Sequence, residues 1–348
     1  MSLFQPPTVW TSLDPEHPLD TRTTPVTREP SPRPGHGLWA RVGGPGYTRA
    51  VSHPLDPSLP DRHLMSTKVV SVRGVQLEVR DDVVVGEEPL EIRAAGPRQT
   101  PVKVAVTMRT PGFEQELALG FLTSEGLIDG NEVIGFEVGD PGFMAEPDDA
   151  ILVRLARKMD PLIGTQRNFV ATASCGICGK ASIDDVAVRC EPLPKGLPVV
   201  ARSVILSLPA TLREAQAAFE RTGGLHAAGL FETDGRLVVV REDVGRHNAL
   251  DKVIGSRVLA RELPLWDRVL LVSGRVSFEI VQKAAVAGIP IICAVSAPSD
   301  LAVRLADRLG VTLVGFLRGD GFNVYTHDGR IDLRDLMGLH AATSAGAS

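Results

Sequence analysis

Apolar strand patterns alternate with helical patterns along the last third of this 348-residue chain, and this alternation restricts the possible folds most. Strands are predicted at 268–272, 289–295 and 311–317, separated by helices at 277–287 and 299–309. A strand that returns to a parallel neighbour through a helix does so by a right-handed crossover, which builds a largely parallel sheet covered on both faces. We therefore predict an α/β fold with helices on both faces of the sheet.

The residues on both sides of this alternating region add further strands to the sheet. The patterns predict two further helices and three further strands: helices 210–222 and 245–262, and strands 225–231, 236–241 and 322–326. Asp234-Gly235 separates two of these strands, and Asp-Gly between apolar runs is a strong hairpin signal. A hairpin adds an antiparallel neighbour, so the sheet should be mixed. We assign residues 201–340 to this α/β domain.

Residues 65–200 form a smaller N-terminal α+β region in this interpretation. A strand is predicted at 101–108, and Thr110 and Pro111 then suit the N-cap and first position of a helix that Gly126 ends. The pattern is weaker beyond Gly126, with one strand near 151–156.

Residues 1–64 differ from the rest of the chain. They contain 12 of the 26 prolines and show neither helical nor strand periodicity. Such a segment cannot bury enough apolar surface to offset the entropy of ordering, so we predict a disordered tail. An alternative is that translation starts at Met65, where a pattern rich in valine begins.

Charge and apolar runs exclude several classes of protein. The net charge of −5 comes from interspersed residues of both signs, which is untypical of proteins that coat nucleic acid. No apolar run approaches the roughly 20 residues that span a bilayer, and the N-terminus has no secretory signal pattern. Four cysteines are too few for a disulfide scaffold in a chain of this length. We therefore expect a cytoplasmic protein that binds neither nucleic acid nor membranes.

The strongest local signal is the cysteine pair Cys175 and Cys178, and the residues alone leave four interpretations open. A zinc site needs four ligands, but Cys190 and Cys293 each stand alone and no pair of histidines follows. A redox dithiol would place the pair at the start of a helix. The glycine after Cys178 disfavours a helix there. A buried pair of small apolar side chains is the structural alternative.

The fourth interpretation is a sulfur carrier, which needs a nucleophilic thiolate on an accessible, adaptable loop. Gly176 and Gly179 give the backbone that freedom. Lys180 would stabilise a nearby thiolate and lower its pKa. We favour this interpretation, with Cys175 and Cys178 as the reactive residues.

Three polar segments follow predicted strands in the α/β domain. The carboxyl ends of strands in an open α/β sheet are where ligands bind, and a helix N-terminus beside an arginine suits an anion. The segments contain these candidate ligand-binding residues: Arg246, His247, Ser273, Gly274, Arg275, Phe316, Leu317, Arg318, Gly319, Asp320 and Gly321.

Several motifs in order make the sequence similar to the FdhD family, the sulfurtransferases that activate formate dehydrogenases. The resemblance spans about residues 69–327, and its matching stretches are 108–112, 120–126, the Cys175-Gly-x-Cys178-Gly loop, 242–252, 273–283 and 312–327. It implies a core like the cytidine deaminase fold. The zinc signature of the deaminases is missing, so deamination is not expected.

The resemblance also implies a mechanism. A cysteine desulfurase would pass sulfur to Cys175 as a persulfide, with Cys178 as its helper. The bound substrate would be the molybdenum (or tungsten) bis-pterin guanine dinucleotide cofactor, sulfurated before its insertion into formate dehydrogenase, and residues 316–321 would contact its guanine nucleotide. No permanent metal is expected, and the protein should be a homodimer. The alternative is a non-enzymatic cofactor-binding chaperone whose cysteine pair holds zinc or senses redox state.

Because the proline-rich composition of residues 1–64 cannot build a core, we expect the remaining chain to fold without them. A protein starting at Met65 should have an unchanged thermal midpoint and support formate dehydrogenase equally well. Thermal unfolding and a complementation assay of both lengths test this, and a large loss in either would show that the segment is part of the working protein.

Overall fold

The computed structural model describes residues 63–138, 149–161, 170–171, 192–194, 196, 198–334 and 336. The predicted tail lies outside these residues except for its last two positions, and so do Cys175, Cys178 and Cys190. The first strand among the described residues is β1 (Leu64–Arg73), which begins one residue before the predicted boundary.

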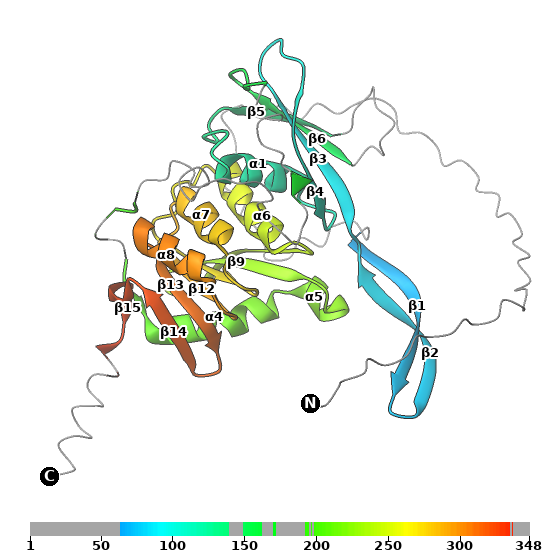
Figure 1. The fold of residues 1–348 in the computed structure, drawn as a ribbon, viewed down its shortest axis with the longest axis vertical. Coiled ribbons are helices and arrows are strands. Elements are labelled where there is room, and N and C mark those ends of the chain that lie inside the picture. Colours follow the sequence, from blue (N-terminus) through cyan, green and yellow to red (C-terminus); the bar gives the residue numbers. More distant parts are fainter. Residues whose placement is uncertain are drawn as a thin grey trace, which may run out of the picture. The chain divides into compact units, whose positions relative to one another are not determined.

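A six-stranded mixed sheet occupies the C-terminal part, as the alternating pattern predicted (Figure 1). Its spatial order is β10-β9-β11-β12-β13-β14. The strand bounds are β9 (His226–Glu232), β10 (Leu237–Asp243), β11 (Arg268–Val272), β12 (Ile291–Ala294), β13 (Thr312–Arg318) and β14 (Gly321–Thr326). β11, β12 and β13 are parallel neighbours, whereas β9 is antiparallel to both β10 and β11. The predicted hairpin is therefore present, and its turn contains Asp234 and Gly235.

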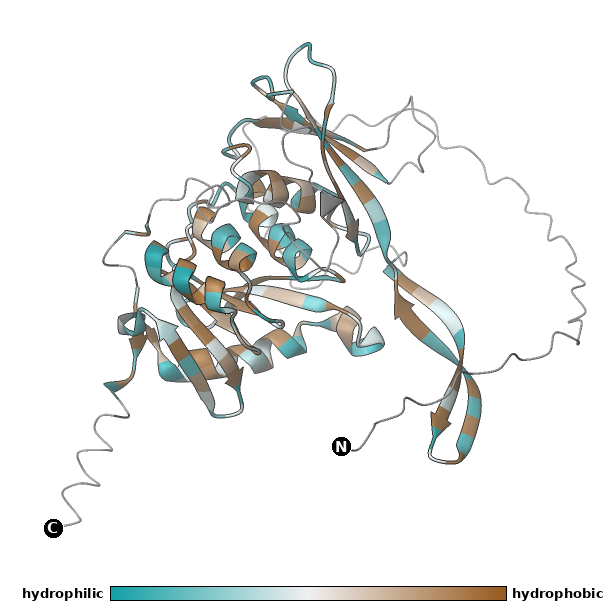
Figure 2. Cartoon of the chain, in the orientation of Figure 1, coloured by the Kyte–Doolittle hydropathy of each residue, from teal (hydrophilic) through white to brown (hydrophobic). Residues whose placement is uncertain are grey.

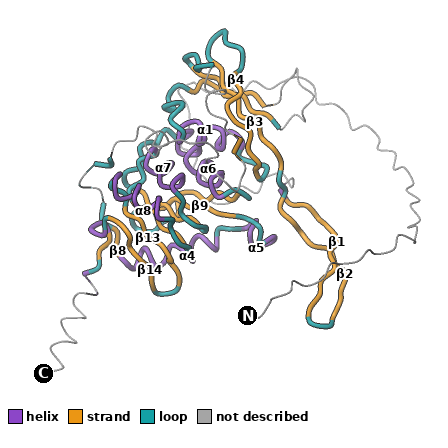
Figure 3. Tube along the Cα trace, viewed as in Figure 1, coloured by secondary structure: helices purple, strands orange, loops and turns teal. Residues whose placement is uncertain are grey.

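Helices cover both faces of this sheet, which confirms the predicted architecture. One face packs against α6 (Arg246–Leu259), α7 (Phe278–Val286) and α8 (Asp300–Leu309), which Figure 3 shows gathered on one side. The other face packs against α4 (Arg202–Glu214). Strand residues alternate between the two cores: Leu270 and Val272 belong to the first, Val269 and Leu271 to the second. The likeness to the cytidine deaminase fold stays a prediction.

A second, five-stranded sheet belongs to the N-terminal part, with the order β5-β6-β3-β4-β7. Its strands are β3 (Glu88–Ala95), β4 (Val102–Arg109), β5 (Val133–Val138), β6 (Ala150–Leu155) and β7 (Val170–Ala171). The helix α1 (Glu114–Ser124) follows β4. Two short strands, β8 (Val200–Ala201) and β15 (Ile331–Asp332), pair in parallel. None of the described helices combines the length and the apolar character that crossing a bilayer requires.

Backbone contact between α1 and α6 joins the two parts of the fold. A side chain at Gly120 would overlap the backbone of Asp251, and one at Gly255 would overlap the backbone of Glu116. The two pairs run in opposite order along the chain, so the helices are antiparallel where they touch. Glycine on both helices allows this approach, because any Cβ would force the backbones apart.

Two helix predictions were wrong in their bounds. The predicted helix 210–222 is two helices, α4 and α5 (Ala217–Thr222), with Gln216 in a non-helical conformation between them. The first of them starts earlier than predicted, and Pro209 lies inside it. Burial of Ile205, Leu208 and Leu212 against the sheet outweighs the hydrogen bond that this proline removes.

The start of α1 was also predicted too early. Thr110 does not cap the helix, which begins at Glu114 after Phe113 in a left-handed conformation. Thr110 is instead buried and contacts Asp243, since its backbone N–H donates to the Oδ2 of that residue over 3.2 Å. A long-range contact here replaces the local cap that the sequence suggested.

The hairpin of β1 and β2 (Gln76–Val85) carries apolar side chains that the described residues leave exposed. Val70 pairs with Val79 and Val72 with Leu77, and each of these four is at least 60% exposed. Figure 2 shows this alternation of apolar and polar positions along both strands.

Because α1 and α6 touch backbone to backbone, one added methyl group at the contact should lower the stability of the fold. Gly255→Ala should lower the free energy of unfolding by about 1–3 kcal/mol, because the helices must separate to admit it. Gly135→Ala is the matched control, since nothing lies within 4 Å of a Cβ there, and it should stay within about 0.5 kcal/mol of wild type. Urea unfolding measures both, and equal values for the two variants would contradict the close approach.

Candidate functional site

The candidate ligand-binding residues lie at one edge of the six-stranded sheet. Because β9 is antiparallel to β10 and β11, strands β10, β11, β12 and β13 all point the same way. The segments that follow three of them therefore emerge at a common edge, which we call the carboxyl edge: 244–247 after β10, 273–277 after β11 and 318–321 at the end of β13. The sequence predicted this placement correctly.

His226 lies at this edge, where β9 begins, and the first two segments approach it. A Cβ on Gly274 would be 3.2 Å from the Nδ1 of His226 and 3.8 Å from the Cδ of Arg246. Burial lowers the pKa of His226, and the positive charges of Arg246, His247 and Arg275 lower it further. Asp243 acts in the opposite direction, but the cationic side chains near His226 outnumber it.

The arginines of this edge have free hydrogen-bonding capacity. The Nε of Arg246 is buried without a hydrogen-bond partner among the described residues. Arg275 is exposed. Buried donors are normally satisfied, so an unpaired guanidinium nitrogen at the carboxyl edge is a position where an anionic ligand would add a hydrogen bond.

Side chains from two helix starts meet beside these arginines. The Nε2 of His247 lies 3.1 Å from the Oγ of Ser277 and 2.9 Å from a carboxylate oxygen of Glu279. The hydrogen bond from His247 holds the pKa of Glu279 below its usual value despite burial. Ser273 is occupied differently, because its hydroxyl accepts the backbone N–H of Ala227 over 2.9 Å.

The segment 316–321 comprises the end of β13, the turn at Gly319 and Asp320, and the first residue of β14. Phe316 has a left-handed backbone, with φ at 54°, and its N–H donates to the carbonyl of Ser296. The guanidinium of Arg318 lies 5.7 Å from the Phe316 ring centroid. Gly319, Asp320 and Gly321 are exposed, whereas the side chain of Leu317 is fully buried in the core, which leaves only its backbone for a ligand.

The structure therefore brings Arg246, His247, Ser273, Gly274 and Arg275 together, and it places residues 316–321 two strands away. No hydrogen bond or ion pair between described residues joins the two groups. The loop after β12 lies between them, since Pro298 bridges to Val276 and packs against Gly315.

Asp243 ties this edge to the N-terminal part through a contact with a residue far away in the sequence. It is fully buried and forms an ion pair of 2.7 Å with Lys252, itself buried. Asp243 also accepts the N–H of Thr110 and the side-chain amide of Asn248. The same amide donates to the carbonyl of Met108 over 2.7 Å.

A second buried ionic cluster lies between α1, α6 and α7. The ammonium of Lys283 contacts the hydroxyl of Ser124 (2.9 Å), Glu125 (2.9 Å) and Asp251 (3.0 Å). Burial disfavours the charged ammonium, but the charges of Asp251 and Glu125 outweigh it and keep the pKa of Lys283 above its usual value.

His226 and Glu279 were missed as site residues. His226 opens an otherwise apolar strand, so nothing local marked it. Among the described residues, no group of three histidine, cysteine, aspartate or glutamate side chains gathers as a metal site would.

Cys175 and Cys178 lie outside the described residues. The last described residue before them is Ala171 in β7, which pairs with Thr107 of β4. The hydroxyl of Thr107 contacts Asn248 near the start of α6, over 3.2 Å. Cys175 follows Ala171 by four positions in the sequence, and four residues of chain reach at most about 14 Å.

Comparison with known proteins decides the family. The model of the FdhD/NarQ family matches residues 85–332, well over half of the chain. The chain belongs to the FdhD/NarQ family. The matched residues include every candidate site residue, Cys175 and Cys178 among them.

Relatives in this family share nearly half of their residues with the chain. A protein of Mycolicibacterium paratuberculosis named sulfur carrier protein FdhD is 49% identical over 76% of this chain and 97% of its own. The protein of that name from Streptomyces coelicolor is 48% identical over 78% and 96%. A solved structure from Desulfotalea psychrophila, of a candidate formate dehydrogenase accessory protein, is 27% identical with a TM-score of 0.61, and covers 78% of this chain and all of its own.

The buried cluster of this family member generates a stability prediction. Lys283→Met should lower the free energy of unfolding by about 3–5 kcal/mol, because Asp251 would keep its burial without its cation. Asp251→Asn in addition should restore part of the loss, which a purely steric effect would not allow. Arg304→Met is the control, since its ion pair with Asp300 is exposed and should contribute about 0–0.5 kcal/mol. Equal losses for Lys283→Met and Arg304→Met in chemical unfolding would refute the ionic role.

Proposed function

We propose that this protein is a sulfurtransferase that carries sulfur as a persulfide on Cys175. The desulfurase persulfide would be attacked at its outer sulfur by the Cys175 thiolate, and the desulfurase cysteine would leave as a thiolate. One S–S bond forms and one breaks, so the step needs no oxidant. The curated relatives are named sulfur carriers, and this shared name over most of the chain carries the proposal.

The acceptor in this proposal is the molybdenum (or tungsten) bis-pterin guanine dinucleotide cofactor, bound as substrate. Attack of Cys178 on the inner sulfur of the persulfide would release the outer sulfur as hydrosulfide and leave a Cys175–Cys178 disulfide. The two thiols supply both electrons, and a cellular dithiol would then reduce the disulfide. Cys178 is therefore the resolving residue.

The electropositive carboxyl edge supports an anionic substrate. The Nε of Arg246 has no partner among the described residues. Arg275 and Arg318 are exposed after β11 and at the end of β13, two strands apart at the same edge. Ala171 leads into the cysteine loop beside Thr107, which contacts the start of α6 at this edge. We propose that the chain after Ala171 brings the sulfur on Cys175 to the bound anion.

The sulfurated cofactor would be passed to formate dehydrogenase, as the accessory role in the Desulfotalea protein's description suggests. We further propose that the protein works in the cytoplasm as a homodimer and holds no permanent metal.

Sulfur loading is the direct test. Incubation with a cysteine desulfurase and cysteine should add the mass of one sulfur atom, located on the Cys175 peptide by mass spectrometry. Cys175→Ser should abolish this addition, whereas Cys178→Ser should permit it and slow turnover. Cys293→Ser is the matched control, because Cys293 is fully buried in β12 and burial raises the pKa of its thiol.

Two results would contradict this proposal. Sulfur found on Cys178 would reverse the two roles. A protein that takes up no sulfur and carries stoichiometric zinc would be a cofactor-binding chaperone instead.

A further inference from the structure

The outer half of the hairpin formed by β1 and β2 has one apolar side and one polar side. Residues that pair directly across an antiparallel ribbon share a side, so Val70 with Val79 and Val72 with Leu77 form two apolar rows. We call these four residues the apolar face. Their neighbours along the chain point to the other side and are mostly polar: Ser71, Arg73, Gln76, Glu78 and Arg80.

The described chain covers the apolar side of the hairpin only near its base. Val83 and Val85 lie on this side and are partly buried, whereas every residue of the apolar face is more than half exposed. Among the described residues no third strand extends the ribbon, and an isolated two-stranded ribbon is at most marginally stable in water. Exposed apolar side chains gathered in one place and rimmed by polar ones mark an interaction surface.

A pair of opposite charges borders the apolar face and indicates what covers it. Lys68 lies directly opposite Asp81 in the next row on the same side of the ribbon. Both side chains are exposed, and neither forms an ion pair or a hydrogen bond with another described residue. A surface with an apolar centre and one charge of each sign at its border is complementary to a copy of itself, because each charge can meet its opposite.

We propose that the apolar face packs against the apolar face of a second copy of this chain, about a two-fold axis parallel to the strands. Such an axis sets β1 of each copy over β2 of the other. Val70 then lies over Val79 of the other copy, and Lys68 lies over Asp81 of the other copy, in both directions across the axis. A two-fold axis across the strands would set β1 over β1, which keeps Lys68 away from Asp81. The inference rests on the homodimer of the proposed function and names a surface that forms it.

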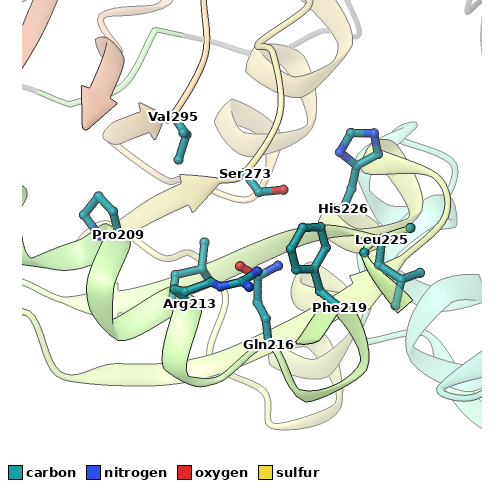
Figure 4. Close-up of a pocket in the computed structure, with 11 residues that line it drawn as sticks. Pro209, Arg213, Gln216, Phe219, Leu225, His226, Ser273 and Val295 are labelled. Carbon is teal, nitrogen blue, oxygen red and sulfur yellow. The ribbon is translucent and has the colours of Figure 1, made fainter. Parts of the chain in front are cut away.

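The hairpin connects this contact to the candidate site of its own copy. β2 contacts α5, and a Cβ on Gly224, shortly after α5, would be 3.4 Å from the Cγ1 of Val85. Gly224 also lines a cavity of about 530 Å³ at the carboxyl edge, together with Phe219 and His226 (Figure 4). The hairpin that makes the contact between copies is therefore anchored at the wall of the site.

The mass of the full-length protein in solution, measured by sedimentation velocity over a range of concentrations, tests the proposal. Wild type should be a dimer. Leu77→Lys should raise the dissociation constant at least about tenfold, because it places unpaired ammonium groups between two apolar faces. Gln76→Lys is the matched control, since it adds the same side chain one position earlier, on the exposed opposite side, and should change nothing. Thermal midpoints show that each variant is folded.

Charge reversal tests the direction of the axis. Lys68→Glu and Asp81→Lys should each weaken the dimer, because each sets like charges against one another across the axis. An equimolar mixture of the two variants should form dimers as wild type does, because the new carboxylate of one variant then meets the new ammonium of the other. Mixing leaves the repulsion inside each hairpin unchanged, so only contact between copies can produce this rescue. A mixture no more dimeric than the separate variants would overturn the proposed axis.

The remaining outcomes separate this contact from the proposed function. A monomeric wild-type protein would overturn both the contact and the homodimer. A dimer that Leu77→Lys leaves as stable as Gln76→Lys does would overturn the contact alone, since the copies would then meet through another surface. Sulfur loading of Cys175 is a separate measurement: a dimer with the expected responses that takes up no sulfur would count against the carrier function alone.

Discussion

The direct backbone contact between α1 and α6 is the constraint on which the rest of this structure depends. Gly120 and Gly255 leave no space for a side chain between the two helices. With the backbones this close, side chains beyond the contact reach partners across the two parts of the chain. Glu116 pairs with Arg241 of β10, over 2.7 Å, and Ser124 hydrogen-bonds to Asp251 of α6 over 2.8 Å. A wider crossing would leave each of these groups short of its partner.

The buried charges exploit that fixed distance. Desolvating an ion is expensive, and the cost is recovered only where geometry is good and the remaining hydrogen bonds are made. Asp243 meets this condition through Lys252, Thr110 and Asn248 together. A shift of the N-terminal part by one helical position would separate these groups and leave the charges uncompensated. The ionic clusters therefore specify one alignment of the two parts, and that alignment brings the end of β4 to the carboxyl edge.

The sequence predicted the sheet well and the site only in part, and the reasons are physical. Strand 268–272 was predicted with its exact bounds, because apolar runs flanked by polar turns report burial directly. The helix break at Gln216 was missed, since it is held by Glu242 from a distant strand rather than by a local breaker. Thr110 looked like a helix cap for the same reason: its partner, Asp243, is 133 residues away. Local sequence patterns cannot show which long-range contacts form in the folded chain.

The distribution of charge at the carboxyl edge is opposite to that of the whole chain. The net charge is −5, so an anion would be repelled at long range. At the edge, however, the nearby carboxylates of Asp243 and Glu279 are already paired with Lys252 and His247. Arg246 keeps an unsatisfied buried nitrogen there. Because screening removes the long-range repulsion within about 8–10 Å at physiological salt, the local excess of cations decides binding. The interior ion pairs that align the two parts of the chain thus also leave this edge positive, and such an edge favours an anionic ligand over a cationic one.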